Sequence, residues 1–235
     1  MKRNGFTLIE MILTIIVGGI LVLGIAGFVE FGAQGYADTV ERQRLQTQAR
    51  FVLEKMTREI RHALPNVFTN SQNGTQSCFS FYPIDYSGFY SVSGADLQFI
   101  VGQDGASQSV LAPRTLIINP TSSLSQADNV ISLSSVTQSG AVFSIANAAS
   151  SIVGGSVGSR HYIFSASNQV TYCVDPSEGF IRRNNTVVAD SVTKGSFDYS
   201  GANIQRGGLV HISLQFSRGD EQTHFEQDVQ VLNVP

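Results

Sequence analysis

The stretch Met1-Lys2-Arg3-Asn4-Gly5-Phe6-Thr7-Leu8-Ile9-Glu10, followed by an apolar run, decides the fold of this chain. Residues 11–29 carry no charge, so Glu10 is a lone carboxylate at the edge of the apolar segment. An ordinary secretory signal places its small-residue cleavage site after its apolar segment, which is then discarded. Here Gly5 precedes that segment. Cleavage after Gly5 would therefore keep the apolar helix at the start of the mature chain.

This order of features resembles the type III signal of type IV pilins and pseudopilins. The residues that carry the resemblance are Gly5 at the cut, Phe6 as the new N-terminus, and Thr7-Leu8-Ile9-Glu10 leading into the apolar run. The resemblance implies that a prepilin peptidase removes residues 1–5 as a leader peptide and N-methylates Phe6. The alternative is a plain signal-anchor helix in which Glu10 has no role.

Residues 6–29 are long enough to cross a membrane as a helix. They number 24, or about 36 Å at 1.5 Å per residue, against a hydrocarbon core of about 30 Å. Lys2 and Arg3 precede the segment, and no basic cluster follows it directly. The positive-inside rule then leaves the N-terminus in the cytoplasm and places the rest outside. We expect a single-pass inner-membrane protein with a periplasmic head, which the resemblance would later place in an extracellular pilus.

The helix is expected to continue through residues 30–64 as an amphipathic segment. Apolar residues recur at steps of three and four, from Val40 through Ala49 and Met56 to Ile60. Pro65 is a natural stop, because proline disfavours helical geometry in the residue before it. The outer part of the helix would bury this stripe against the head.

Residues 65–235 show short β-type runs separated by turn residues, which predicts a globular β-rich head. Together with the helix this gives an α+β fold: a long N-terminal helix packed on an antiparallel sheet-rich head. Residues 175–179 read as a hairpin loop, and residues 121–160 as loops and edge strands. The expected strands are 78–82, 97–101, 115–118, 130–133, 141–145, 162–165, 170–174, 179–182, 209–216 and 225–232.

Cys78 and Cys173 are the two cysteines, and both lie in the part expected outside the cytoplasm. An even number of cysteines in an exported protein indicates one disulfide. By loop entropy such a bridge, closing about 95 residues, would add about 4–5 kcal/mol to the stability of the head. Two free buried thiols are the alternative.

The composition excludes several classes of function. From Pro65 onward seven Lys and Arg face twelve Asp and Glu, which argues against nucleic acid as the main partner. Arg182-Arg183, the one basic pair of the head, is interpreted as a solvated hairpin end. The four histidines stand at no metal-ligand spacing, and no catalytic or nucleotide-binding motif occurs. We therefore expect no enzyme, no cofactor and no metal.

Calcium is a weaker alternative at the 175–179 loop. Asp175 and Glu178 offer two carboxylates there, whereas Ca²⁺ takes six or more oxygen ligands.

Two further stretches resemble one subgroup, the biogenesis proteins of the mannose-sensitive haemagglutinin (MSHA) type IV pilus. They are the helix end at residues 50–65 and the closing residues 227–235, and residues 197–199 and 206–210 fit as well. The resemblance implies a low-abundance minor pilin that helps to initiate or cap the filament. Its partners would be other pilins, major and minor, and the prepilin peptidase.

Two alternatives remain open beside the minor pilin. One is a J-type pseudopilin of type II secretion, since such proteins end their helices similarly. The other is a ligand-binding tip adhesin, in which the aromatic residues Tyr82, Tyr86, Phe89 and Tyr90 could stack on a sugar. Packing in the core or at a sheet edge is the other use of these rings, and their exposure would decide between the two.

Glu10 is the residue expected to direct assembly. A carboxylate within the bilayer costs about 2.5–3.5 kcal/mol on insertion scales, and such groups usually mark a functional pairing. After cleavage Phe6 supplies a cationic amine at a similar depth, and methylation keeps that charge. The amine of one subunit could then meet Glu10 of the next. Pairing within one chain is the alternative.

Overall fold

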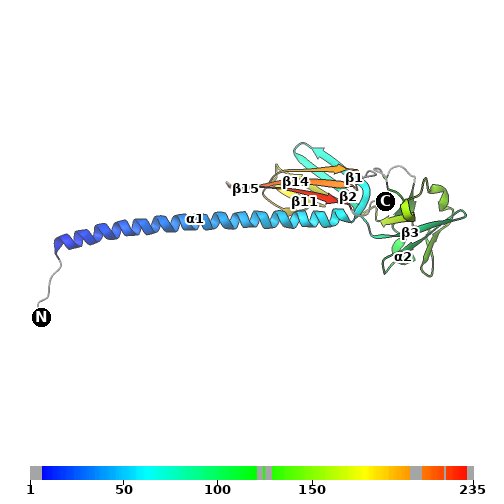
Figure 1. Cartoon of the computed structure of the whole chain (residues 1–235), viewed down its shortest axis with the longest axis horizontal. Coiled ribbons are helices and arrows are strands. Elements are labelled where there is room, and N and C mark those ends of the chain that lie inside the picture. The colour runs from blue at the N-terminus through cyan, green and yellow to red at the C-terminus, as the bar shows by residue number, and fades with distance from the viewer. Residues whose placement is uncertain (1–6, 121–123, 125–128, 202–207, 220, 232–235) are drawn as a thin grey trace. The chain divides into compact units, whose positions relative to one another are not determined.

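The computed structural model describes residues 7–120, 124, 129–201, 208–219 and 221–231. Residues 1–46 and 47–235 form two compact units. The expected α+β fold is confirmed: a long N-terminal helix leads into a head built of antiparallel sheets, with the outer part of the helix packed on the head (Figure 1).

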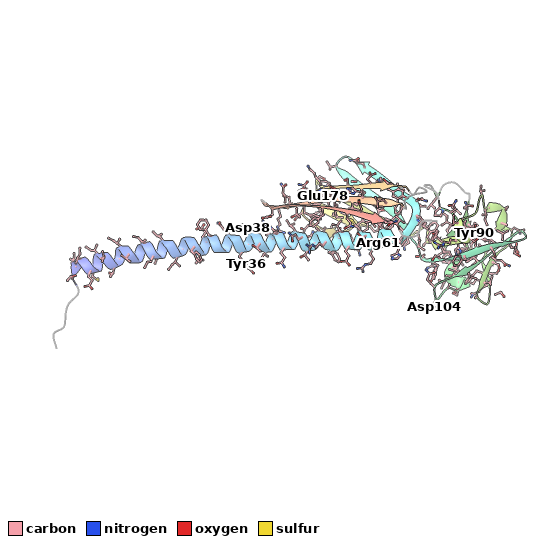
Figure 2. All side chains as sticks on the ribbon, in the orientation of Figure 1. Tyr36, Asp38, Arg61, Tyr90, Asp104 and Glu178 are labelled. Atoms are coloured by element: carbon pink, nitrogen blue, oxygen red, sulfur yellow. A yellow bond between two sulfur atoms is a disulfide. The ribbon has the colours of Figure 1, made fainter. Side chains whose placement is uncertain are left out.

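Helix α1 spans Leu8–Arg61 without interruption. Its first half is apolar and exposed, and the side chains around Tyr36 and Asp38 project from all sides of the helix (Figure 2). The stripe expected to pack on the head is buried further along: Ala49, Val52 and Met56 are fully buried. Val40, the first residue of the expected stripe, remains exposed.

The helix ends three residues earlier than its predicted end at Leu64. The His62 amide still bonds the Glu59 carbonyl, and strand β1 (Ala63–Asn73) then begins at once. Pro65 lies inside this strand. Because the residue before proline favours extended geometry, the chain is already in a strand where the helix was expected to stop.

Two antiparallel sheets lie against the end of the helix and share an aromatic core. The five-stranded sheet has the order β1-β2-β10-β11-β12, and the three-stranded sheet the order β13-β14-β15. Phe79 stacks on Phe197 with ring centroids 5.5 Å apart, and Phe68 lies 4.5 Å from Tyr199, so rings from both sheets interlock. The remaining bounds are β2 Gln76–Pro83, β10 Val170–Asp175, β11 Phe180–Arg183, β12 Thr186–Ala189, β13 Val192–Ser200, β14 Leu209–Arg218 and β15 Glu221–Gln230.

A seven-stranded sheet occupies the chain between β2 and β10, and we call residues 86–164 the insert. Its strands run in the order β6-β5-β9-β3-β4-β8-β7 and surround a core of their own, which includes Leu97, Phe99 and Ile163. A second, smaller cluster joins Tyr162 and Phe164 of the insert to β1. The bounds are β3 Tyr86–Ser93, β4 Asp96–Val101, α2 Gln108–Leu111, β5 Thr115–Ile117, β6 Val130–Ser132, β7 Thr137–Ser139, β8 Val142–Ile145, η1 Ala148–Ser151, η2 Val157–Ser159 and β9 Arg160–Phe164.

Each of the ten expected strands corresponds to a strand of the structure, with ends shifted by a few residues. The last residue of the expected strand 225–232 lies outside the described residues. Five strands were not expected: β1, β3, β7, β12 and β13. The predicted hairpin loop at 175–179 is confirmed, since the Gly179 amide bonds the Asp175 carbonyl between β10 and β11.

Candidate functional site

Glu10 lies in the first turn of α1 and is the acidic residue of that turn. The amides of Glu10 and Met11 bond the Thr7 carbonyl at 3.2 and 3.3 Å, which starts the helix three residues before the carboxylate. The side chain of Glu10 is exposed, and no bond to another described residue is found for it. A carboxylate near the positive end of the helix dipole is favoured where it stands. Gly5 and Phe6, the expected processing residues, lie outside the described residues.

The side chains of the apolar half of α1 are largely exposed. Leu8, Ile16 and Leu23 are among the large apolar residues exposed along it, and after Glu10 the next charge is Glu30. By length and composition α1 holds one segment able to cross a membrane, and the most apolar window of that segment is not buried within the molecule. An exposed apolar surface of this extent is typical of a segment that contacts lipid or other protein.

A charged network fixes the other end of α1 to the head. The Tyr172 hydroxyl donates to Glu59 Oε2 at 2.9 Å, and Arg183 Nε donates to the two oxygens of the same carboxylate at 3.1 and 2.9 Å. Lys55 Nζ lies 3.6 Å from Glu59 Oε1. Burial and then the neighbouring Glu59 raise the pKa of Tyr172, and the hydrogen bond to Glu59 raises the pKa of Arg183. The Glu59 carboxylate on the helix thus binds side chains from two neighbouring strands, β10 and β11.

The interpretation of Arg182-Arg183 as a solvated hairpin end is wrong, because both side chains are only partly exposed, at 27% and 30%, and both form ion pairs. Arg182 pairs with Glu178 across the hairpin, whereas Arg183 reaches Glu59 on the helix. Alternation explains the difference: successive side chains of a strand point to opposite faces, so only one arginine of the pair can face α1.

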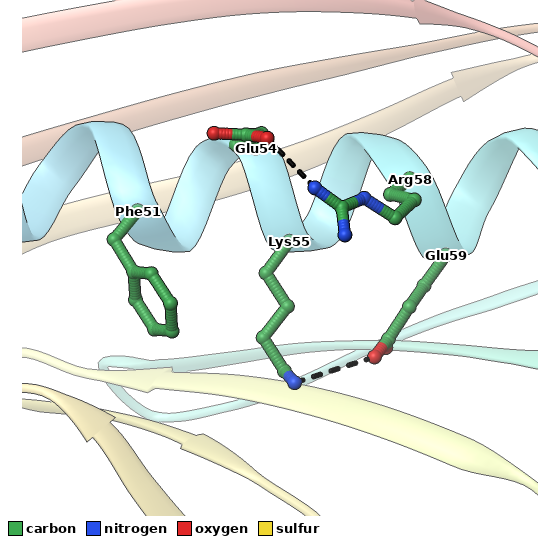
Figure 3. A pocket seen from close by; sticks show the side chains of 5 residues that line it. All are labelled: Phe51, Glu54, Lys55, Arg58 and Glu59. Carbon is green, nitrogen blue, oxygen red and sulfur yellow. Dashed lines mark hydrogen bonds and ion pairs between the residues drawn. The ribbon is translucent and has the colours of Figure 1, made fainter.

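A shallow hollow of about 360 Å³ lies on the face of α1 beside this network. Phe51 stands at one end of it, and the pairs Glu54–Arg58 and Lys55–Glu59 follow along the helix (Figure 3). Phe51 is 59% exposed, although it belongs to the part of the helix that packs on the head. The hollow is therefore an apolar spot within a charged surface.

The expected disulfide between Cys78 and Cys173 is present, and the two cysteines face each other in the β2–β10 pairing. The whole insert lies in the chain between β2 and β10. The disulfide therefore links the strand after which the insert begins to the strand that follows its end. Strand β2 is the second strand after the helix, not the first as the sequence suggested, because β1 precedes it.

The 175–179 loop uses its carboxylates for the turn itself. The Asp175 carboxylate accepts bonds from the amides of Ser177 and Glu178 and from the Ser177 hydroxyl, while Glu178 pairs with Arg182. These bonds, led by the one from the Ser177 hydroxyl, lower the pKa of Asp175. Among the described residues no group of three His, Cys, Asp or Glu side chains could hold a metal ion.

The four aromatic residues considered for sugar binding do not gather in one exposed patch. Tyr82 packs edge-on against Phe164, Tyr86 lies under the Arg114 guanidinium, and the Tyr90 hydroxyl accepts the Ser156 amide at 3.1 Å. Only Phe89 of the four is counted among the exposed large apolar residues. Packing is thus the use of three of these rings.

His161 was missed as a notable residue by sequence reasoning. It is fully buried in the insert beside the Phe99 ring, with ring centroids 5.1 Å apart, and among the described residues neither of its ring nitrogens has a hydrogen-bond partner. Burial lowers the pKa of His161 to about 4. His161 is one of four consecutive buried residues of β9, so no alternation marks the face on which it lies, and no sequence signal marks its lack of a hydrogen-bond partner.

Comparison with known proteins adds to this geometry at the N-terminus. Residues 1–26 match the model of the prokaryotic N-terminal methylation motif, which is typical of type IV pilin-like proteins. Proteins with this motif are structural and not enzymatic. No curated protein and no solved structure matches the chain. The motif and the helix-on-sheet architecture are together consistent with a type IV pilin fold.

Proposed function

We propose that the chain is a minor pilin of an MSHA-type type IV pilus, of the kind represented by the MshO biogenesis protein, and that it takes part in initiation or tip formation. The observation that carries this proposal is the methylation motif at residues 1–26, placed on a helix whose apolar half is exposed and holds one carboxylate, Glu10. Such a surface is costly in water and suited to lipid or to packing against other pilins.

The proposed path begins in the inner membrane. Residues 6–29 hold the chain there, with the N-terminus in the cytoplasm and the head, residues 65–235, in the periplasm. The prepilin peptidase cleaves between Gly5 and Phe6 and methylates the new amine. The Glu10 carboxylate of one subunit then pairs with the amine of its neighbour, which in a medium of low dielectric constant fixes the register between the two helices.

The size of the head supports a minor role over a major one. The insert adds a seven-stranded sheet to the two sheets that lie against the helix. A bulky head is harder to repeat along a tightly packed fibre than at its tip.

The experiment compares two carboxylates of the same helix, Glu10 and Glu30. Glu10→Val and its matched control Glu30→Val are expressed in cells that lack the native chain, and sheared pili are collected. Both proteins should be processed to the same intact mass, starting at Phe6, but only Glu10→Val should be depleted from pili, by about tenfold or more. Wild-type amounts of Glu10→Val in the pili contradict the role of Glu10.

Processing is tested separately with Gly5→Leu, which should keep residues 1–5 attached. A wild-type chain that retains Met1 to Gly5 in the membrane contradicts the prepilin interpretation. Wild-type protein that never leaves the cell envelope, together with a secretion defect in its absence, favours the pseudopilin of type II secretion.

A further inference from the structure

Strand β15 forms an open edge of the three-stranded sheet. It spans Glu221–Gln230 and pairs with β14 along its whole length without a bulge, and no other described strand pairs with it. An edge strand presents unpaired backbone N–H and C=O groups on its free side, which makes it a template for a further strand. The free side of β15 is therefore a candidate interaction surface.

The other edge strands of the described sheets are short, irregular or otherwise occupied. Strand β12 has four residues, and β6 and β7 have three each. Strand β1 contains Pro65 and a shift of register, and β13 contains Lys194 and a similar shift. The Asn70 side chain of β1 also donates to the Phe197 carbonyl of β13. Shortness, proline, lysine and bulges are the usual protections of an edge, and β15 has none of them.

The inner face of β15 is incompletely covered. Phe225 packs edge-on against Phe216 of β14, with ring centroids 6.2 Å apart, yet Phe225 is only half-buried. Leu214, which lies directly opposite Phe225 on β14, is fully buried. A further strand with an apolar residue next to Phe225 would complete the cover of this ring.

The outer face of β15 limits which strand can pair there. The side chains of His224, Glu226 and Asp228 lie on this face, and each is more than half exposed. Like charges directly opposite each other on neighbouring strands are destabilising, whereas opposite charges and hydrogen-bonding pairs are favourable. The partner strand must therefore offer a cation or a donor opposite each carboxylate.

We infer that β15 pairs with β15 of a second copy of the chain, antiparallel and centred on Phe225. In this register His224 of each copy lies opposite Glu226 of the other, and each Gln222 lies opposite Asp228. Every such pair occurs twice, because a two-fold axis relates the copies. The two Phe225 rings meet on the inner face, where each is half-buried in a single copy.

The same side chains disfavour the neighbouring registers. A centre at Glu226 places two glutamates directly opposite each other, and a centre at His224 removes both histidine–glutamate pairs. A slip of one residue would turn the inner side chains of one copy to the outer face. In a single copy His224 Nε2 lies 3.0 Å from Glu226 Oε1 of the same strand, so pairing exchanges this contact for the matching one between copies.

The biological meaning of this pairing rests on the proposed function. A minor pilin at the tip is present in low abundance, so the second copy comes from a second filament. The contact uses residues of the head alone and is separate from the contacts of the apolar helix that build one filament. Pairing through β15 thus joins the tips of two filaments.

The test is self-association of the full chain held one copy per lipid nanodisc, which keeps the apolar helices of two chains apart. Sedimentation velocity should show reversible pairing of wild-type discs. His224→Glu should weaken the pairing about tenfold or more, because it places two pairs of carboxylates opposite each other. The double variant His224→Glu/Glu226→His restores the complementary order and should pair as the wild type does.

Lys194→Glu is the matched control. Lys194 lies on β13, in the same row of the sheet as Gln215 and His224, and its substitution changes the charge more than His224→Glu does. Its discs should pair normally, since β13 is the opposite edge. Wild-type discs that stay single overturn the inference, as does a double variant that does not regain pairing. Capture of a different pilin through β15 by discs that stay single overturns it as well.

Failure of this inference is distinguishable from failure of the proposed function. Discs of Glu10→Val should pair normally although this variant is depleted from pili. His224→Glu should enter pili in wild-type amounts although its discs stay single.

Discussion

The two parts of the head differ in what holds them in place and in the side chains on their surfaces. The five- and three-stranded sheets lie against α1 through buried apolar residues and through the Glu59 network. The outer face of the three-stranded sheet carries the hydrogen-bonded pairs His211–Asp228 and His224–Glu226. The insert has its own core, few charges, and a buried histidine whose ring nitrogens have no hydrogen-bond partner among the described residues. We infer that the first part positions the head on its helix, whereas the second part is held by its own core.

The comparison depends on the two strands where the parts meet. Strands β2 and β10 belong to the five-stranded sheet, yet the insert leaves from one and returns to the other. The Cys78–Cys173 bridge joins them.

Removal of the disulfide should have the largest effect. The double variant Cys78→Ser/Cys173→Ser should lose up to about 4–5 kcal/mol of unfolding free energy, because the open chain gains the entropy of a loop of about 95 residues. Denaturant unfolding followed by circular dichroism measures the total. In hydrogen exchange, the amides of β2 and β10 should lose protection first, and the amides of the core strands of the insert should lose less. An equal loss of protection in both parts would show that the head unfolds as one unit and would break the comparison.

The second prediction concerns pH and separates His161 from His211. His161 has an ordinary pKa of 6.5 when unfolded and a pKa of about 4 when buried. Above pH 6.5 both states are neutral and the full stability is present. As the pH falls toward 4, only the unfolded chain takes up the proton, so stability falls by about 3 kcal/mol in total.

His211 should follow the opposite trend. The hydrogen bond to Asp228 raises its pKa above 6.5, so its small contribution is present below pH 6.5 and is lost as the pH rises through the raised value. The side chain of His211 is 43% exposed, so this effect is screened by solvent.

Denaturant unfolding at pH 7.0 and pH 4.5 measures the effect of His161. The difference between wild type and His161→Phe isolates it from the carboxylates, which titrate in both proteins, and His161→Leu serves as a second variant should the larger ring not fit. Identical pH dependence in the wild type and in both variants would contradict the assignment of a buried neutral histidine to the insert.

Much of this architecture could be predicted from local pattern. The N-terminal motif and the hairpin at 175–179 are each encoded in a few neighbouring residues. The long helix follows from a repeated spacing of apolar residues, and the disulfide from a count of two cysteines in the head. Strand β14 alternates strictly, which marks one buried face. Such signals do not depend on what the segment packs against.

The missed elements depend on contacts that no local pattern contains. Strand β3 has the sequence Tyr-Ser-Gly-Phe-Tyr-Ser-Val-Ser, which is rich in serine and has no fully buried residue. Its glycine further weakens the strand signal, because glycine in a strand interior lowers strand stability. Gly88 is required there by tertiary packing, since a Cβ atom would lie 1.9 Å from the Ile100 carbonyl oxygen. Likewise Glu59 lies 113 residues from Tyr172 and 124 from Arg183 in the chain, so their network could not be inferred from spacing.

The smallest predicted effect tests whether the first part of the head truly positions the helix, and it uses two glutamates one and a half turns apart on α1. Glu59 is 23% exposed and accepts bonds from Tyr172 and Arg183, whereas Glu54 is 72% exposed and pairs with Arg58 on the same helix. Glu59→Gln removes the charge but keeps the shape. It should cost about 1–2 kcal/mol, because bonds to a charged group are stronger than neutral ones and the partial exposure screens them. Glu54→Gln should cost less than about 0.5 kcal/mol, as exposed pairs within one helix do.

Stability alone does not distinguish a positioning role from general support of the head. Hydrogen exchange of the α1 amides near Met56 and Ile60 distinguishes the two roles. Glu59→Gln should speed the exchange of these amides relative to the amides of β14, whereas Glu54→Gln should leave both exchange rates unchanged. Both apolar side chains are fully buried, so their amides report whether the helix stays seated on the sheets. Equal effects of the two substitutions would mean that apolar burial alone seats the helix, and the ionic network would then lose its assigned role. The unequal outcome follows from the geometry, since only Glu59 bonds to residues of the sheet.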